Sequence, residues 1–359
     1  MKPHLFNLFP EDLCSEVTAL GDSITLPEAR RVLAHVVGNG NQDYVLKKKP
    51  VRVALQKVLA QSFSQRLLKI VERIEDPVDN SVRYLFEAED GTLIEAVRIA
   101  LLKPGHYSVC LSSQAGCAMA CDFCATGRLG FKRNLEPWEI IAQFWQIKKE
   151  TTGKLSGAVF MGQGEPFHNY DHVIRAAKIL SSPVGLQVNS KNITISTVGI
   201  VPQIRRYTEE GHNFRLIVSL TTAIPEKRRR LLPIANTWPL TELAAAIKDH
   251  GLKRKERMTL AWVLIKGFNS GQDEVIALKQ LFKDVPITLN LIDVNDNRQD
   301  GYQRANDTER GQFLEFLQEL KMPIVRRYSV GNASESACGM LAGKFKSKTE
   351  QISNFANSK

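Results

Sequence analysis

Residues 117–124 of this chain read CAMACDFC, with cysteines at positions 117, 121 and 124. Cysteine thiolates are the usual ligands of iron–sulfur clusters, and a short cysteine-rich run is how a chain wraps one. Three thiolates hold three irons of a 4Fe-4S cluster and leave the fourth iron without a protein ligand. An open coordination position is what separates a catalytic metal centre from a closed structural one. The spacing therefore predicts a reactive iron–sulfur site with Cys117, Cys121 and Cys124 as ligands.

A structural zinc site is the alternative for the same cysteines. Such a site needs four ligands and usually comes as two pairs of Cys or His. The chain has no second Cys-x-x-Cys, and the nearest upstream histidine, His106, lies eleven residues before Cys117. The ligand count falls short of a closed zinc site, so the cluster is the favoured interpretation.

The spacing Cys-x-x-x-Cys-x-x-Cys resembles the signature of the radical S-adenosylmethionine (SAM) enzymes, in which the open iron binds SAM. The surrounding sequence narrows this resemblance: residues 110–117 read CLSSQAGC, 124–127 CATG, 131–135 FKRNL and 337–339 ACG. Together these stretches resemble the RlmN/Cfr family of radical SAM RNA (adenine) methyltransferases, from about residue 20 to about residue 345. The resemblance implies methylation of an adenosine carbon, with 23S rRNA as the first candidate substrate and tRNA as the second.

The hydrophobic pattern predicts an α/β fold. Short apolar runs alternate with amphipathic helical stretches such as 137–149 and 307–320, and this alternation is typical of a parallel sheet with helices outside it. The family resemblance makes this a partial (β/α)6 radical SAM barrel, whose reactive groups we expect at the C-terminal strand ends. The expected strands cover residues 108–111, 157–161, 192–196, 215–220, 258–264 and 287–292.

The N-terminal part has a different pattern. Residues 26–36 and 54–71 are expected to be helices, and residues 83–86 and 92–99 are expected to be two strands joined by a turn at Asp90-Gly91. We therefore predict a small, mainly helical accessory domain at residues 1–93, a radical SAM core at 94–345 and a C-terminal tail at 346–359.

The resemblance also implies which residues bind SAM. Gly164 and Glu165 follow the second expected strand of the core, where glycine lets the backbone approach a ligand and a carboxylate can accept from an ammonium. The remaining SAM positions implied by the family lie at or beyond later strand ends: Ser196, Ser219, Leu220, Thr221 and Asn295. Without the family resemblance, most of these SAM positions would be interpreted as ordinary loop residues.

Three further residues match the family's reaction. SAM can methylate a nucleophile directly, but the target carbon of adenine is electrophilic, so a carrier is required. Cys338 matches the cysteine that carries the methyl group as S-methylcysteine, Cys110 matches the thiol that resolves the adduct through a transient disulfide, and Glu95 matches the proton acceptor. Two SAM molecules are then used per turnover. Outside the family, Cys338 would be read as a small buried residue and Glu95 as a solvated one.

The charge pattern suits a nucleic-acid substrate. The chain has a net charge of +10, and residues 1–93 are close to neutral, so the basic excess lies in the core. Lys and Arg side chains supply most non-specific affinity for phosphates. Each basic run, such as 47–49, 227–230 or 253–255, taken alone is more typical of a solvated surface.

Nothing in the sequence suggests export or membrane insertion: the N-terminus has no apolar signal core, and no apolar run is long enough to span a bilayer. We expect a cytoplasmic monomer whose electron donor is a flavodoxin or ferredoxin.

Departures from the family pattern limit what can be said about the substrate. Thr221 stands where the family usually has His, and residues 293–296 and 334–336 differ from the usual turn and acidic pattern. The carbon of adenine that is methylated, 2 or 8, is therefore left open. The alternatives are a radical SAM enzyme acting on a small molecule or peptide, and a non-catalytic iron–sulfur or zinc protein that binds RNA.

Overall fold

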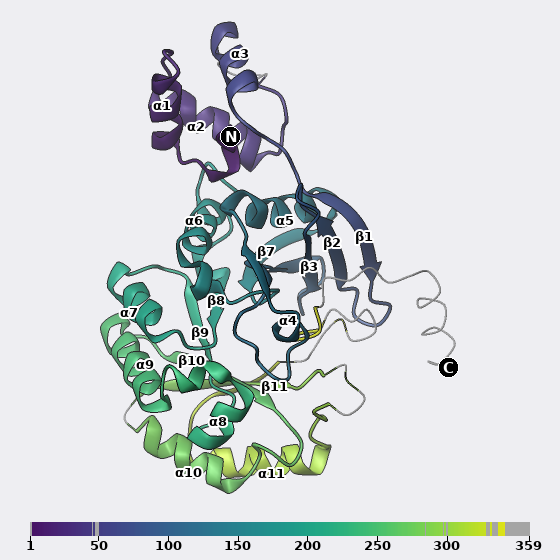
Figure 1. Cartoon of the computed structure of the whole chain (residues 1–359), viewed down its shortest axis with the longest axis vertical. Helices are drawn as coiled ribbons and strands as arrows, with labels where there is room; N and C mark the ends of the chain where they lie inside the picture. Colours follow the sequence, from purple (N-terminus) through teal and green to yellow (C-terminus); the bar gives the residue numbers. More distant parts are fainter. Residues whose placement is uncertain are drawn as a thin grey trace.

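The computed structural model describes residues 2–44, 46, 50–283, 285–296, 298, 301–327, 331 and 337–341. The basic run 47–49, the departure at 334–336 and the expected tail 346–359 lie outside these residues. Figure 1 shows a helical unit at the N-terminal end of the molecule and a larger unit of sheet and helices below it.

The N-terminal unit contains η1 (Leu5–Asn7), α1 (Pro10–Ala19), α2 (Leu26–Leu33), η2 (Ala34–Gly38) and α3 (Val53–Ser62). Local sequence explains where α2 begins. Thr25 and Glu28 form a capping box, in which the Thr25 side chain accepts from the Glu28 amide and the Glu28 carboxylate accepts from the Thr25 amide at 3.0 Å. The apolar faces of these helices belong to the same hydrophobic core as the rest of the chain.

One ten-stranded sheet forms the centre of the larger unit. Its spatial order is β1-β2-β3-β4-β7-β8-β9-β10-β11-β12. The pairs β1–β2, β2–β3 and β3–β4 are antiparallel, and every pair from β4 to β12 is parallel. The strands are β1 (Lys69–Glu75), β2 (Val82–Glu87), β3 (Leu93–Ala100), β4 (His106–Leu111), β7 (Lys154–Phe160), β8 (Ile193–Thr197), β9 (Arg215–Ser219), β10 (Met258–Leu264), β11 (Ile287–Asp293) and β12 (Ile324–Arg327).

Helices connect the parallel strands and cover the outside of the curved sheet (Figure 1). This right-handed crossover pattern brings the C-terminal ends of all parallel strands to one edge. The helices are α5 (Pro137–Glu150), α6 (Tyr170–Ser181), α7 (Val201–Glu210), α8 (Pro225–Leu231), α9 (Leu240–Arg254), α10 (Gln272–Leu281) and α11 (Asp307–Gln318), with short turns η3 (Pro166–Asn169), η4 (Ser190–Asn192) and η5 (Pro233–Asn236).

The structure confirms the α/β fold with a partial barrel. All six expected core strands are present, each with bounds that differ from the expected ones by at most three residues. The helix expected at residues 54–71 is wrong in its second half: α3 ends at Ser62, and Lys69–Glu75 forms β1 because it pairs with β2. Strand β12 was not expected at all. Both errors concern short segments whose state is set by a pairing partner, which local pattern does not show.

The domain division stays a prediction. Helices α1 to α3 precede all strands of the sheet in the sequence. However, β1, β2 and β3 belong to the same sheet as the barrel strands, and the predicted boundary between residues 93 and 94 falls inside β3. No helix in the described part of the chain is both long and apolar enough to cross a membrane.

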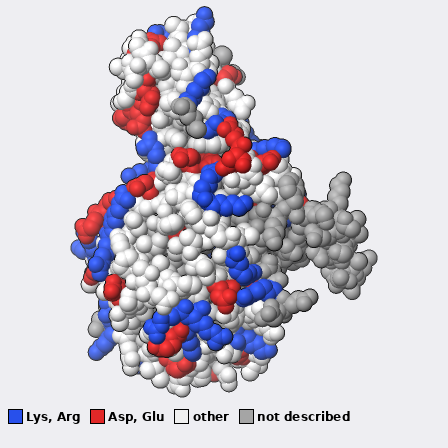
Figure 2. All heavy atoms as spheres, viewed as in Figure 1, with Lys and Arg blue, Asp and Glu red and all other residues white. Residues whose placement is uncertain are grey.

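The basic residues are mixed with acidic ones over the face seen in Figure 2. Arg229 pairs with Glu226, and Lys227 pairs with Asp273. The run 227–230, read from sequence as a surface run, needs a correction: Arg228 is 1% exposed.

Candidate functional site

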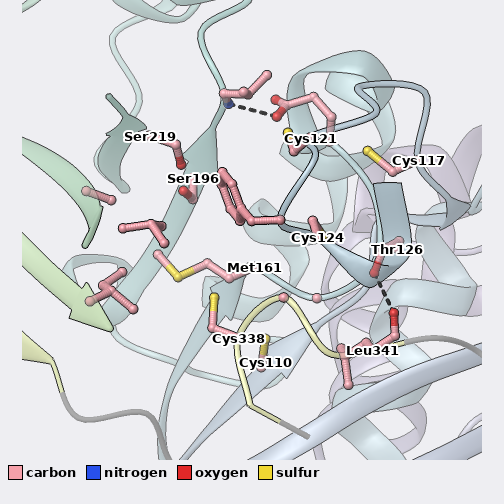
Figure 3. A pocket seen from close by; sticks show the side chains of 18 of the residues that line it. Cys110, Cys117, Cys121, Cys124, Thr126, Met161, Ser196, Ser219, Cys338 and Leu341 are labelled. Carbon is pink, nitrogen blue, oxygen red and sulfur yellow. Dashed lines mark hydrogen bonds between the residues drawn. The ribbon is translucent and has the colours of Figure 1, made fainter. Parts of the chain in front are cut away.

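A pocket opens at the C-terminal ends of the parallel strands. Its walls come from β3, β4 and β7 to β12, from residues 117–126 and from residues 337–341. Ten residues expected in the site line it: Cys110, Cys117, Cys121, Cys124, Gly164, Glu165, Ser196, Ser219, Asn295 and Cys338. Figure 3 shows several of them together, with Cys110 and Cys338 side by side below Met161 and with Cys117 and Cys121 on the opposite side.

The cysteine-rich loop is held at both ends by backbone hydrogen bonds. Strand β5 (Gln114–Gly116) pairs with β6 (Phe131–Asn134), and the Cys117 amide donates to the Gly130 carbonyl at 2.9 Å. Gly116 has a φ of +72°, and a Cβ there would lie 1.9 Å from the Gly130 oxygen. Only glycine fits this position, so the loop enters the pocket at a fixed point.

The middle of the loop contacts the opposite wall. The Asp122 amide donates to the carbonyl of Leu231, the last residue of α8, at 3.0 Å. The Asp122 carboxylate accepts from the Tyr302 hydroxyl at 2.6 Å and pairs with Arg298 at 3.2 Å. Cys121 packs in an apolar cluster with Leu231 and its neighbours. These contacts fix the loop between α8 and the segment that follows β11.

Two of the three loop thiols, those of Cys117 and Cys121, are held where burial disfavours their charged form. Burial raises the pKa of Cys117 to about 12 and the pKa of Cys121 well above its ordinary value. A metal would therefore have to displace protons from these thiols as it binds. In the described ranges, no group of three or more His, Cys, Asp or Glu side chains is placed to hold a single metal ion. The irons of a cluster stand at separate corners, so its thiolates need not converge on one point.

The turn after β7 brings Gly164 and Glu165 against the loop. Gly164 has a φ of +96°, and a Cβ there would lie 2.5 Å from the Gln114 side chain. The Glu165 carboxylate accepts from the amides of Phe167 at 2.9 Å and Val198 at 2.8 Å. Burial raises the pKa of Glu165 to about 7, and these hydrogen bonds oppose that rise. A bound ammonium would favour the carboxylate further.

The expected SAM residues on later strands divide into two groups. Ser196 and Ser219 line the pocket from the ends of β8 and β9. Leu220 and Thr221 are fully buried behind this wall, and the amides of both donate to the Ala261 carbonyl. Thr221 has a φ of +63°, which is rare for a β-branched residue, and its buried hydroxyl has no hydrogen-bond partner among the residues that the structure describes.

Residues 337–341 lie across the pocket and are attached to the loop. The Ala125 amide donates to the Gly339 carbonyl at 2.7 Å, and the Thr126 hydroxyl donates to the Leu341 carbonyl at 2.7 Å (Figure 3). The Asn295 amide side chain donates to the Cys338 carbonyl at 3.2 Å. Asn295, expected to contact SAM, thus holds the Cys338 segment in this structure.

Cys110 and Cys338 face each other in the pocket although they are 228 positions apart in the sequence. Burial raises the pKa of Cys110 to about 12, the charge of Cys338 acts in the same direction, and Arg327 opposes both. Cys338 is exposed as a residue, but burial of its thiol also raises its pKa, and Arg327 again opposes. All six cysteines are free thiols here, so the expected disulfide between Cys110 and Cys338 is not formed in this structure.

Glu95 does not line the pocket. It is fully buried on β3, two residues before Val97, which does line it. Its carboxylate pairs with Arg83 at 2.7 Å, and Arg83 pairs in turn with Glu72 at 3.0 Å. The Glu95 amide donates to the Gln163 side chain at 3.3 Å, so this residue is tied to the turn that carries Gly164.

Comparison with known proteins identifies the family. The profile of the Radical SAM superfamily matches residues 111–278. A crystal structure of a radical SAM methyltransferase from Sphaerobacter thermophilus superposes with a TM-score of 0.86 at 31% identity, covering 95% of this chain and all of that one. The chain is therefore a radical SAM methyltransferase.

Relatives narrow the family further. A probable RNA methyltransferase of Anaeromyxobacter sp. strain Fw109-5 is 45% identical over 333 residues, 92% of this chain and 97% of that protein. The probable dual-specificity RNA methyltransferase RlmN of Symbiobacterium thermophilum is 35% identical over 324 residues, 89% of this chain and 86% of that protein. The chain belongs to the RlmN/Cfr family, as its sequence predicted, and this family implies both SAM and a 4Fe-4S cluster. The interpretation as a non-catalytic protein is set aside.

Sequence reasoning missed the residues that support these groups. Arg83, Gln163 and Thr126 contact expected site residues or their segments, yet none stands in a motif that signals such a role. Period-two alternation placed Glu95 on a strand, but only the register of β2 against β3 brings Arg83 near it. Arg327, at the end of β12, was missed because that strand was not expected.

Proposed function

We propose that this protein methylates a carbon of adenine in RNA, with 23S rRNA as the first candidate and tRNA as the second, through S-methylcysteine at Cys338. The observation that carries the proposal is the position of Cys110 and Cys338 in the pocket that also contains Cys117, Cys121 and Cys124 (Figure 3). The RNA methyltransferases among its relatives support RNA over a small molecule or peptide. The basic excess outside residues 1–93 agrees with this substrate.

The donor set of the pocket fits an iron–sulfur cluster. Cys117, Cys121 and Cys124 offer only sulfur, line one pocket, and leave room beside Glu165 for a further ligand. When bound, the cluster supplies the electron that cleaves SAM to methionine and a deoxyadenosyl radical. Gly164 and Glu165 hold the methionine part of SAM, and Ser196 and Ser219 offer hydrogen bonds to the rest of it. Leu220 and Thr221 support these residues from behind, and Asn295 lines the pocket beside the Cys338 segment. A flavodoxin or ferredoxin is the proposed electron donor.

The carrier thiol accounts for the use of two SAM molecules. The Cys338 thiol loses its proton to solvent, and the thiolate takes a methyl group from one SAM, which leaves as S-adenosylhomocysteine. The S-methyl group would then lose a hydrogen atom to the deoxyadenosyl radical from a second SAM, giving 5′-deoxyadenosine, and the carbon radical on Cys338 would bond to adenine. This adduct would give one electron to the oxidised cluster, and Glu95 accepts the proton of the ring carbon.

Cys110 then completes the reaction. It attacks the sulfur of Cys338, the bond from that sulfur to carbon breaks, and the methylated base leaves as its new methyl group takes up a proton. The two cysteines are left as a disulfide, which a cellular thiol reduces. Glu95 has to share or leave its ion pair with Arg83 to take part, because its carboxylate is fully buried in this structure.

Replacement of each thiol tests the proposal. Cys338→Ala should keep the cluster and abolish methyl transfer. Cys110→Ala should form the adduct but not release it, so that RNA remains covalently joined to Cys338 and is detected by mass spectrometry of the purified protein. Cys14→Ala, in α1, is the matched control and should behave like the wild type. Normal turnover by the Cys110→Ala protein would refute the two-thiol mechanism.

Mass mapping of RNA identifies the substrate. rRNA and tRNA from a strain lacking the gene should lack one methyl group on an adenosine, and the complemented strain should regain it. The fragment that changes names the RNA, and comparison with 2-methyl- and 8-methyladenosine standards names the carbon. Unchanged rRNA and tRNA would contradict an RNA substrate.

A further inference from the structure

Arg228 is a buried cation that lies behind the pocket-lining residues Val198 and Ser219. It lies in α8 and is 1% exposed, whereas its neighbours Arg229 and Arg230 are exposed. Burial lowers the pKa of Arg228 to about 10, which still leaves the guanidinium charged at neutral pH. A buried charge is costly unless an opposite charge accompanies it.

The hydrogen-bond partners of Arg228 do not balance its charge. Its Nη atoms donate to the carbonyls of Ser219 at 3.0 Å and Val198 at 2.7 Å, and to the carbonyl of Leu220. Its Nε has no hydrogen-bond partner in the described ranges of the chain. Within the described part of the chain, no carboxylate forms an ion pair with Arg228, so the protein supplies dipoles to this cation but no anion.

The position of Arg228 points to where an anion belongs. Leu231 follows one helical turn after Arg228, and its carbonyl accepts from the Asp122 amide in the middle of the cysteine loop. Cys121 packs with Leu231 and Leu232, and its thiolate and Arg228 attract each other. The Glu165 carboxylate accepts from the amide of Val198, the residue whose carbonyl accepts from Arg228. Arg228 is thus linked through Leu231 to the cluster loop and through Val198 to the turn proposed to bind SAM.

A purely structural role does not require a charge here. Arg228 joins the ends of β8 and β9 by donating to Val198 and Ser219, but a neutral amide or a smaller donor could make such bonds. Three cysteine thiolates around a 4Fe-4S cluster give a group with a net negative charge, and reduction by one electron makes it more negative. A fixed cation nearby stabilises the reduced state more than the oxidised state.

We propose that Arg228 is the buried counter-cation of the iron–sulfur cluster, a positioning residue that makes the cluster easier to reduce while it holds the ends of β8 and β9. This inference rests on the proposed function, because it requires a cluster bound by Cys117, Cys121 and Cys124. It adds a determinant of the cluster's reduction potential that the cysteine motif does not contain.

The reduction potential tests the proposal without measuring activity. The full-length protein is loaded with its cluster anaerobically, without SAM or RNA, and titrated with dithionite as reductant while the reduced cluster is followed by electron paramagnetic resonance. Arg228→Gln should lower the potential: at a fixed solution potential, the ratio of reduced to oxidised cluster should fall about tenfold, a shift of about 59 mV for one electron. Arg228→Lys keeps the charge and should stay near the wild type. Arg229→Gln, in the same helix but exposed, is the matched control and should not shift it.

Each outcome decides between the possibilities. An unchanged potential in a loaded Arg228→Gln protein would overturn the proposal. If that variant cannot be loaded, Arg228→Lys decides alone, because a large negative shift despite the retained charge would mean that geometry, not charge, matters. If the wild type itself binds no cluster, the proposed function fails, which is a different result from a cluster whose potential ignores Arg228.

Discussion

Arg83 and Arg228 are both buried, on two sides of the same barrel, and they differ in what surrounds them. Arg83, on β2, forms ion pairs with Glu95 and Glu72. Arg228, on α8, contacts only backbone carbonyls among the hydrogen-bond acceptors that the structure describes. On the first side, the fold contains both charges of the pair. On the second side, the cation lies behind the pocket in which we propose an external group to bind.

This difference suggests that the two sides of the pocket have different tasks: one carries the residues proposed for proton transfer and thiol chemistry, and the other is proposed to bind a cofactor. The side built on β2 to β4 carries Glu95 and Cys110, the proposed proton acceptor and resolving thiol, and there the Glu95 carboxylate forms an ion pair with Arg83. The side built on β8, β9 and α8 carries hydrogen-bond donors and the positive charge of Arg228, for which we propose a bound cofactor as the anion. A buried polar site without its ligand is less stable than the same site with the ligand bound.

The largest effect should come from removing the anion that we place opposite Arg228. Cys117→Ala, Cys121→Ala and Cys124→Ala should each lose the cluster, because each thiolate is expected to hold one iron. Anaerobically reconstituted wild type should contain about four irons and four sulfides per chain. Cys338→Ala should keep them, since Cys338 is not an expected ligand. If the wild type contained one zinc and no labile sulfide, there would be no cluster for Arg228 to balance, and the contrast with Arg83 would fail.

The next effect concerns the free energy of unfolding of the cluster-free protein. Arg83→Met leaves two carboxylates without their partner, one of them fully buried, and should cost about 3 to 5 kcal/mol. Arg228→Gln leaves no carboxylate unpaired and should cost less, about 1 to 3 kcal/mol from lost hydrogen bonds. Urea unfolding at neutral pH measures both, with Arg229→Gln as the exposed control. Equal costs for the two buried arginines would remove the distinction drawn between them.

A smaller effect should come from His4, a buried ionisable group for which the described residues provide no paired anion and for which we propose no cofactor. His4 is 4% exposed, stacks on Trp138 and hydrogen-bonds to the Arg66 carbonyl at 2.9 Å. Burial lowers the pKa of His4 from 6.5 to about 4. The folded protein therefore keeps His4 neutral at a pH where the unfolded chain already protonates it. Its contribution to stability is complete above pH 6.5 and is lost as the pH falls towards 4.

The measurement for His4 is the free energy of unfolding as a function of pH. The wild type should lose roughly 2 kcal/mol through this residue between pH 7.5 and pH 5. His4→Gln should lack that part of the pH dependence, and His35→Gln, where the histidine pairs with Asp43, serves as a comparison. If the free energy of unfolding of the wild type and of the His4→Gln protein changed with pH in parallel, the lowered pKa of His4 would not contribute to the pH dependence of stability.

The parts of the structure that could be predicted are those determined by local sequence patterns. The apolar runs gave six barrel strands, and the cysteine spacing gave the loop that enters the pocket. The run 227–230 shows the limit: sequence presents four equivalent basic residues, and only the packing of α8 against β8 and β9 buries Arg228 and leaves Arg229 exposed. In the same way, Glu95 was expected in the site, but its ion pair depends on strand register.

Residues that meet across long stretches of chain were not predictable. Thr126 and Leu341 are 215 positions apart, and their hydrogen bond follows from the return of the chain after β12. Strand β1 was expected as helix for a related reason, since its state depends on β2. The family resemblance supplied the roles of Cys110 and Cys338, but the local sequence had no means of showing that they lie side by side.

The hydrogen bonds from Ala125 and Thr126 to Gly339 and Leu341 make the cysteine loop and the Cys338 segment parts of one cooperative unit. Whatever orders the loop also favours docking of the segment, and thermodynamic reciprocity requires that docking favour the ordered loop by the same factor. If the loop binds the proposed cluster, metal binding and docking of the Cys338 segment should therefore strengthen each other by the same factor. We expect substitutions that weaken the hydrogen bonds between loop and segment to lower the affinity of the loop for its metal as well.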